Sequence, residues 1–209
     1  MVYGGGKILG SLHAKAAAAK SRSLLRIGWG LSSVQSSRFS LKYFRSQRVL
    51  DLIGTRDWGD SRFEYAPCTS CMSQEFNTPA AAQHELVFYL HAGKTQGMGL
   101  QVPDGVPVMT NTGASLADAL QFIASGNTVV SNSYHGVYWT MLMGRKAVCI
   151  PFSNKFSAYR LPPAIATVDN WRQVVKEAVA HSDFLGLSRE ATQTFKTMVD
   201  NRLADAGAL

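Results

Sequence analysis

The sequence of 209 residues contains no apolar stretch that approaches the ~20 residues needed to cross a bilayer. Its first residues also lack the pattern of a secretory signal. Lys7, Lys15 and Lys20 are interspersed with alanines, and no continuous apolar core or cleavage site follows them. We therefore expect a cytoplasmic protein.

Cysteine is scarce, with three residues in all, and Cys149 lies inside an apolar run. An odd number of cysteines argues against a disulfide framework and favours a reducing compartment. Cys68 and Cys71 form one Cys-x-x-Cys pair without a second pair, and His84 and His91 do not stand at a standard zinc spacing. We interpret the pair as two ordinary thiols in a loop and expect no metal.

Charged residues make up only 17% of the chain, but the formal net charge is +7. The basic residues of the N-terminal part are spread out, and no nucleic-acid-binding motif accompanies them. We therefore expect no nucleic-acid partner. An anionic small substrate would suit the positive charge, and so would peripheral contact with an anionic membrane surface that carries a lipid-linked sugar.

The chain has no internal repeat, and its short apolar segments alternate with helical patterns. Strands are expected at Leu24–Gly28, Val49–Ile53, Glu85–His91, Val106–Thr110, Thr128–Ser131 and Lys146–Ile150. Helices are expected at Ser11–Lys20, Phe39–Gln47, Ser115–Gly126, Gly136–Met143, Trp171–Ala180 and Arg189–Leu203. Continuous apolar strands that alternate with helices predict an α/β fold with Rossmann-like parallel sheets covered on both faces.

Residues that typically begin or end helices refine this pattern. Ser115 followed by Asp118 predicts a capping box, with Gly126 as the glycine that ends the same helix. Gly144 is expected to stop the helix before it. Residues 58–82 are irregular and predict a long loop or linker, so the chain is divided into a partial N-terminal domain, 1–82, and a C-terminal domain, 83–209.

The segment Ser-Asn-Ser-Tyr-His-Gly lies between a predicted strand, which ends at Ser131, and a predicted helix, which starts at Gly136. Ligands of open parallel sheets bind at such points, where a helix N-terminus favours phosphate or carboxylate. Asn132 and Ser133 supply hydrogen-bond donors, and Gly136 lets a ligand approach. His135 is the group that can transfer a proton near neutral pH. The alternative is that Ser133 only caps the helix and His135 is a buried, satisfied histidine.

Other candidates follow other strands. Arg56 could hold a carboxylate bidentately with Asp57 to orient it, and the alternative, which the spacing alone favours, is a surface salt bridge at a loop. Gly5 and Gly6 could let the backbone approach a ligand or form a tight turn, and Lys155 is either a phosphate contact or a solvated lysine.

A phosphate-binding P-loop is excluded by the spacing. The run Gly93-Lys94-Thr95 matches the end of such a loop, but its first glycine would have to stand where Phe88 is.

Together these segments resemble the polysaccharide pyruvyl transferase family, in order and spacing, over roughly residues 45–160. The matching stretches are Gly4-Gly5-Gly6, Gly54–Asp57, Pro67–Met72, Ser131–Gly136 and Gly144–Ser153. The resemblance implies two Rossmann-like halves in a GT-B-like arrangement. It also implies transfer of pyruvate from phosphoenolpyruvate to a sugar of a cell-surface glycan or exopolysaccharide, with His135 essential and Arg56 binding the donor.

Members of that family usually carry a complete N-terminal Rossmann half before the glycine run. We therefore expect a short or N-terminally truncated form with an incomplete acceptor half, needing no cofactor beyond phosphoenolpyruvate as donor substrate. Two alternatives stay open: a nucleotide-sugar-dependent GT-B glycosyltransferase, and a non-catalytic remnant that binds a glycan.

Overall fold

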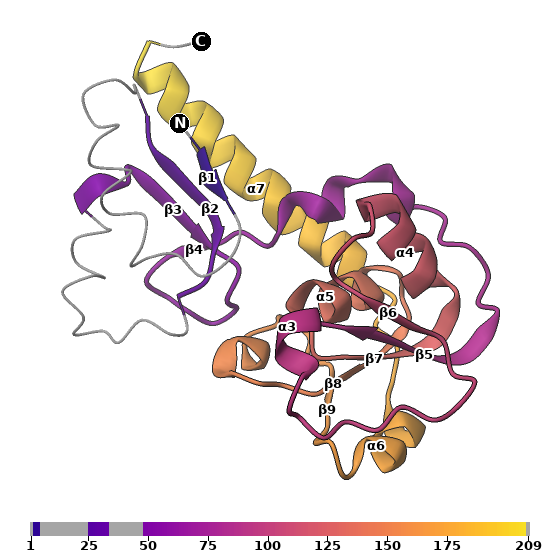
Figure 1. Ribbon diagram of the computed structural model, residues 1–209. Helices are drawn as coiled ribbons and strands as arrows, with labels where there is room; N and C mark the ends of the chain where they lie inside the picture. The colour runs from indigo at the N-terminus through magenta and orange to yellow at the C-terminus, as the bar shows by residue number, and fades with distance from the viewer. Residues whose placement is uncertain (1, 5–24, 34–47, 208–209) are drawn as a thin grey trace. The chain divides into compact units, whose positions relative to one another are not determined.

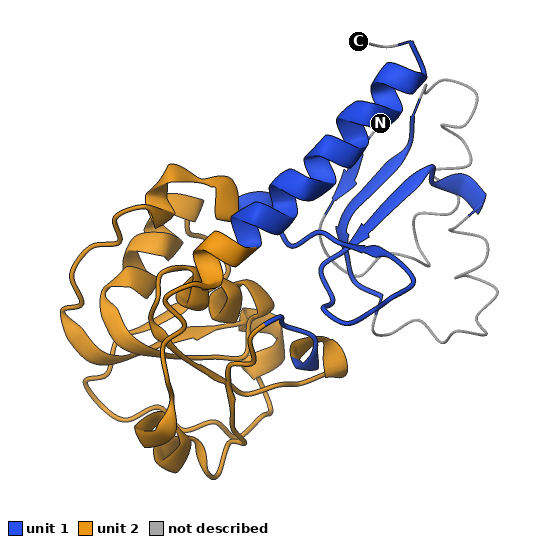
Figure 2. Cartoon of the chain, turned by 180° about the vertical axis from the view of Figure 1, so that it is seen from behind, with its two compact units in different colours: residues 1–70, 157–160, 188–209 blue, residues 71–156, 161–187 orange. Residues whose placement is uncertain are grey.

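The computed structural model describes residues 2–4, 25–33 and 48–207 (Figure 1). The chain divides into two compact units, each with its own parallel sheet (Figure 2). Unit 1 comprises Met1–Ser70, Ser157–Arg160 and Ser188–Leu209, and unit 2 comprises Cys71–Phe156 and Leu161–Leu187. The predicted α/β class with Rossmann-like parallel sheets is confirmed, whereas the predicted GT-B-like arrangement stays a prediction.

Four predicted features lie outside the described residues. They are the helices expected at Ser11–Lys20 and Phe39–Gln47 and the two glycines Gly5 and Gly6.

Unit 1 contains a four-stranded sheet in the order β1-β2-β3-β4. Its strands are β1 (Val2–Gly4), β2 (Ile27–Leu31), β3 (Leu52–Thr55) and β4 (Glu64–Tyr65). The two predicted strands of this region are present but begin three residues later than expected, so they include glycines that were assigned to loops. Position 54 of β3 is a glycine because a Cβ there would lie 2.5 Å from Cβ of Ala66 and 2.8 Å from Cζ of Phe195.

The long C-terminal helix α7 (Phe184–Asp205) supplies part of the unit 1 core. Phe195 packs its ring edge-on against Trp29, with centroids 4.8 Å apart, and joins Ile27 and Ala66 in one buried cluster. The boundary between the units therefore lies after Ser70 rather than after residue 82. The C-terminal segment from Ser188 belongs to unit 1 together with the N-terminal part of the chain. The physical reason is that α7 makes apolar contacts with residues of the unit 1 sheet.

Unit 2 contains a five-stranded sheet in the order β6-β5-β7-β8-β9. Its strands are β5 (His84–Leu90), β6 (Val108–Thr110), β7 (Gly126–Ser131), β8 (Lys146–Cys149) and β9 (Ala164–Ile165). The first four confirm predicted strands with small boundary shifts, and β9 was not predicted. Because the chain adds β6 on one side of β5 and β7 on the other, the topological switch point lies between β5 and β7.

The helices of unit 2 are α3 (Ala92–Thr95), α4 (Leu116–Ala124), α5 (Tyr134–Leu142) and α6 (Trp171–Glu177). The predicted capping box of α4 and the predicted stop of α5 at Gly144, whose φ is +63°, are both confirmed. None of the helices in the described ranges is long and apolar enough to span a bilayer.

Gly126 was expected to end α4, and this prediction is wrong. It is the first residue of β7, and a Cβ there would lie 2.5 Å from Cγ2 of Val87 on the neighbouring strand. The glycine is needed for close contact between strands rather than for a helix stop.

The segment 58–82 is only partly the long loop expected from the sequence. It contains β4 and two single-turn 3₁₀ helices, η1 (Thr69–Met72) and η2 (Gln74–Phe76). Cys71 and Phe76 are buried, so apolar contacts hold the segment in place.

Candidate functional site

The carboxyl end of β7 carries the segment that was the strongest candidate in the sequence. Ser131 is fully buried and its Oγ donates a hydrogen bond to the carbonyl oxygen of Tyr89, while it accepts one from the backbone N–H of Ser133. A Cβ on Gly136 would overlap Oγ of Ser131 and Cδ1 of Tyr89. Gly136 is thus required for α5 to pack closely on the sheet, which is a structural reason different from the predicted approach of a ligand.

Asn132 joins β7 to the turn after β5. It is fully buried, its side-chain carbonyl accepts a hydrogen bond from the backbone N–H of His91 at 2.7 Å, and its amide donates to Oγ1 of Thr95 at 3.0 Å. The side chain therefore positions His91 and Thr95, instead of presenting the predicted donors to a ligand. A buried amide with both ends paired holds this edge rigid.

Helix α5 begins at the same edge. Ser133 is its N-cap, in agreement with the alternative interpretation of this residue, and its Oγ accepts a hydrogen bond from the backbone N–H of Gly136. The positive end of the helix dipole therefore lies at the carboxyl end of β7, where it favours an anion.

His135, in the first turn of α5, is half-buried rather than buried as the alternative interpretation expects. Its ring stacks on Trp139 one turn later, with centroids 5.1 Å apart and planes at 28°, and meets Tyr134 edge-on at 5.8 Å. Two aromatic neighbours fix the imidazole while part of it stays accessible. Such a group can exchange a proton with a ligand.

The segment after β8 brings Lys155 to this edge, in the 3₁₀ helix η3 (Asn154–Ser157). The Nζ of Lys155 lies 4.3 Å from the ring centroid of Phe152 and 4.8 Å from that of Phe156. Burial raises the pKa of the Cys149 thiol at the end of β8, and the charge of Lys155 acts in the opposite direction. The lysine is therefore held beside the end of β8, and the predicted contact with a phosphate stays a prediction.

Two residues at this edge were not identified as anion ligands from the sequence. His91 follows the last residue of β5, and its ring meets Phe152 edge-on with centroids 5.8 Å apart. The Nζ of Lys94 lies 5.7 Å from the same Phe152 centroid. We call His91, Lys94, Phe152 and Lys155 the Phe152 cluster. The available signal was a histidine and a lysine directly after a strand, which sequence reasoning considered only for zinc and for a P-loop.

Arg56 and Asp57 lie at the carboxyl end of β3 in unit 1, whereas His135 belongs to unit 2. Arg56 and Asp57 are 5% and 1% exposed, so the alternative of a surface salt bridge does not hold. The Asp57 carboxylate accepts hydrogen bonds from Oγ of Ser32 at 3.0 Å and from the backbone N–H of Ser33. Asp57 thus ties the end of β3 to the loop after β2.

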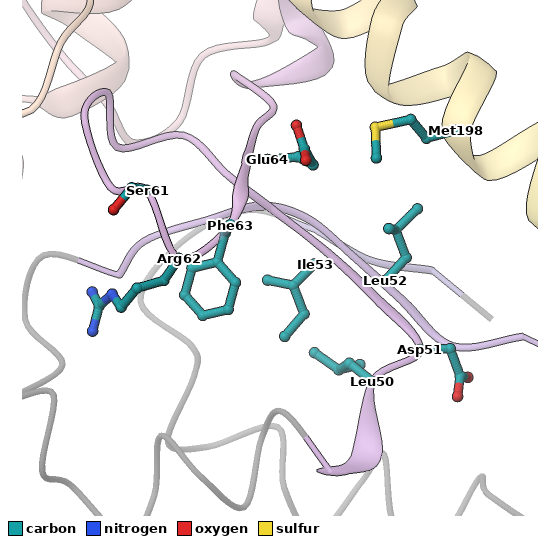
Figure 3. Close-up of a pocket in the computed structure, with 9 residues that line it drawn as sticks. All are labelled: Leu50, Asp51, Leu52, Ile53, Ser61, Arg62, Phe63, Glu64 and Met198. Atoms are coloured by element: carbon teal, nitrogen blue, oxygen red, sulfur yellow. The ribbon is translucent and has the colours of Figure 1, made fainter.

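A cavity of about 340 Å³ in unit 1 opens beside β3, β4 and α7 (Figure 3). Two of its charged side chains are engaged in ion pairs, since Asp51 pairs with Arg26 and Arg62 pairs with Asp60, each at 2.6 Å. A second cavity, of about 420 Å³ in unit 2, is lined by Asp118 of the capping box and by Phe122. The described candidate residues line neither cavity.

No group of three or more histidine, cysteine, aspartate or glutamate residues that could hold a metal ion occurs within the described ranges. Comparison of the chain with protein-family models, with curated proteins and with solved structures gives no match. The fold and this edge therefore define the protein only as an α/β chain with a candidate anion site in unit 2.

Proposed function

We propose that the protein is a transferase that moves pyruvate from phosphoenolpyruvate onto two hydroxyls of a sugar, as a ketal. The observation that carries the proposal is the placement of His135, the N-terminus of α5 and Lys155 beyond the carboxyl ends of the neighbouring strands β7 and β8. The donor is named from the resemblance of Ser131–Gly136 and Gly54–Asp57 to the pyruvyl transferase family.

Phosphoenolpyruvate suits this edge because it is strongly anionic. A helix N-terminus and an ammonium group both stabilise a phosphate, and the switch point of a parallel sheet is the usual position for phosphate-bearing ligands. The resemblance also implies that Arg56 binds the donor carboxylate, since a guanidinium binds a carboxylate bidentately, and that role stays a prediction.

Formation of the ketal requires a group that transfers protons. The methylene carbon of the donor gains a proton to become a methyl group, two sugar oxygens bond to the central carbon, and inorganic phosphate leaves. One hydroxyl proton ends on the methyl group and the other on the phosphate. We assign the transfer of protons between hydroxyl and carbon to His135, because an imidazole is a common general acid and base.

The test is incubation with phosphoenolpyruvate and a panel of β-galactosides, with phosphate release and the mass of the sugar product measured together. We expect equal amounts of phosphate and of a pyruvylated sugar. His84→Gln serves as the matched control for His135→Gln, because His84 is the exposed first residue of β5 at the opposite edge of the sheet.

Two results would contradict the proposal. The first is a folded protein that gives no pyruvylated product with any acceptor of the panel. The second is thermal stabilisation by a nucleoside diphosphate without any by phosphoenolpyruvate, which would favour a nucleotide-sugar glycosyltransferase.

A further inference from the structure

We propose that the Phe152 cluster is a phosphate-binding site in which His91, Lys94 and Lys155 contact the phosphate oxygens. The inference deepens the proposed function, because it names the groups that hold the donor's phosphate. It rests on that function only for the identity of the donor.

The first argument is convergence. Strands β5 and β8 are the two neighbours of β7, and all three run parallel, so their carboxyl ends lie at one edge. His91 comes from the end of β5 and Phe152 from the segment after β8, and their rings meet at 5.8 Å. The cluster thus joins the two strands that flank the start of α5, whose dipole favours an anion.

The second argument is the state of the polar atoms. Among the residues that the structure describes, Nδ1 of His91 and Oγ of Ser153 are buried and make no hydrogen bond. Buried polar atoms without a partner are uncommon because they lose their bonds to water. A phosphate oxygen is an acceptor for an imidazole N–H and for a hydroxyl, so one phosphate could satisfy both groups.

The third argument is charge. Lys94 and Lys155 place their ammonium groups 5.7 Å and 4.3 Å from the centroid of one phenyl ring. Within the described part of the chain, Lys94 forms no salt bridge. Two like charges on one ring repel each other, and a dianion at this edge would offset the repulsion.

The number of donors distinguishes phosphate from carboxylate. A phosphate monoester has three terminal oxygens, whereas a carboxylate has two. Three potentially cationic side chains on two separate segments suit the tetrahedral group, and lysine is a usual phosphate ligand that acts as a point charge. We therefore assign the phosphate monoester of the donor to the Phe152 cluster.

The experiment is calorimetric titration of inorganic phosphate into the full chain and into variants of the cluster. We expect His91→Gln and Lys94→Gln each to weaken phosphate binding roughly tenfold or more, because each removes a hydrogen bond to a charged group. His91→Asn should bind more tightly than His91→Gln, since the asparagine nitrogen stands near the position of Nδ1.

The control variants are His84→Gln and Lys146→Gln. His84 and Lys146 are the first residues of β5 and β8, so they carry the same chemistry at the opposite edge of the sheet. For β5, with seven residues, that edge is roughly 20 Å away. We expect both controls to bind phosphate as the unaltered protein does.

Saturable phosphate binding that is unchanged in both His91→Gln and Lys94→Gln would overturn the inference, and so would a folded protein that binds no phosphate. Circular dichroism checks the folding of each variant, and Lys94→Gln decides if His91→Gln does not fold, because the Lys94 side chain is exposed.

The inference and the proposed function fail separately. If phosphate binding depends on His91 and Lys94 but no pyruvyl transfer occurs, the phosphate site is supported and the proposed reaction is contradicted. If pyruvyl transfer occurs but phosphate binding does not change when either residue is substituted, the proposed reaction is supported and the phosphate site is contradicted.

Discussion

Both sheets of this protein carry polar residues at the carboxyl ends of their strands, yet the two edges differ in accessibility. In unit 1 the residues Arg56 and Asp57 are almost completely buried, and Asp57 holds the loop after β2 by hydrogen bonds to Ser32 and Ser33. In unit 2, His135 and most of the Phe152 cluster are half-buried, and Lys94 is exposed. At this position in the sheet Asp57 therefore serves local structure in unit 1, whereas in our account the accessible groups of unit 2 bind a ligand.

The largest effect should come from the accessible edge. We expect His135→Gln to lower pyruvyl transfer by about 10²–10⁴-fold, the usual contribution of a general acid or base. The melting temperature should change little, because the side chain is half-buried and a glutamine still packs against Trp139. Full activity in this variant would mean that His135 has a structural role, as Asp57 has in unit 1.

The next largest effect should come from the buried edge of the unit 1 sheet. It should change the stability of the protein and not its binding of phosphate. Asp57→Ala removes the acceptor for the Ser33 N–H and the Ser32 hydroxyl, so we expect the free energy of unfolding to fall by roughly 3 kcal/mol. Chemical denaturation measures the change. Phosphate binding below the transition should be unaffected, and its loss in folded protein would contradict the contrast between the edges.

Glycine substitutions test the packing behind each edge. Gly54→Ala in unit 1 and Gly136→Ala in unit 2 each place a methyl group against side chains of a neighbouring strand or helix. We expect each to lower the free energy of unfolding by about 1–3 kcal/mol through overpacking. Gly186→Ala is the control, because its Cβ would meet nothing within 4 Å in helix α7 and should stabilise the protein slightly.

Much of this architecture was predictable because its signals are local. The Ser115–Asp118 capping box and the stop at Gly144 depend on a few neighbouring residues, and the apolar runs of β5, β7 and β8 are continuous in the sequence. Gly126 was misassigned because its requirement comes from Val87 on another strand. The same reason applies to Gly54 in β3, where a Cβ would meet Ala66 and Phe195.

The candidate site was predictable only in part. His135 and Lys155 follow two different strands and were identified from that position. The pairing of His91 with Phe152 depends on the order of the strands in the sheet, which places β5 and β8 on the two sides of β7. Because strand order is set by tertiary contacts, no pattern in the sequence near His91 indicated it.

The smallest expected effect is a pH dependence at an exposed helix start. Hydrogen bonds from the side chain and backbone of Ser115 hold the pKa of Asp118 below its usual 3.8. The capping box therefore stabilises the protein above pH 3.8, and this stabilisation is lost as the pH falls through the lowered value. We expect Asp118→Asn to lower the melting temperature by a few degrees at most near neutral pH, and the difference to vanish in acid. A constant difference across that range would show that the ionised carboxylate is not involved.

The most direct test of the contrast between the two edges is a titration of inorganic phosphate into ¹⁵N-labelled protein, followed by backbone amide shifts. Our account predicts saturable shifts at His91, His135 and Lys155 in unit 2 and none at Ser32 and Ser33 in unit 1. Shifts centred on Ser32 and Ser33, with none at the unit 2 edge, would contradict it.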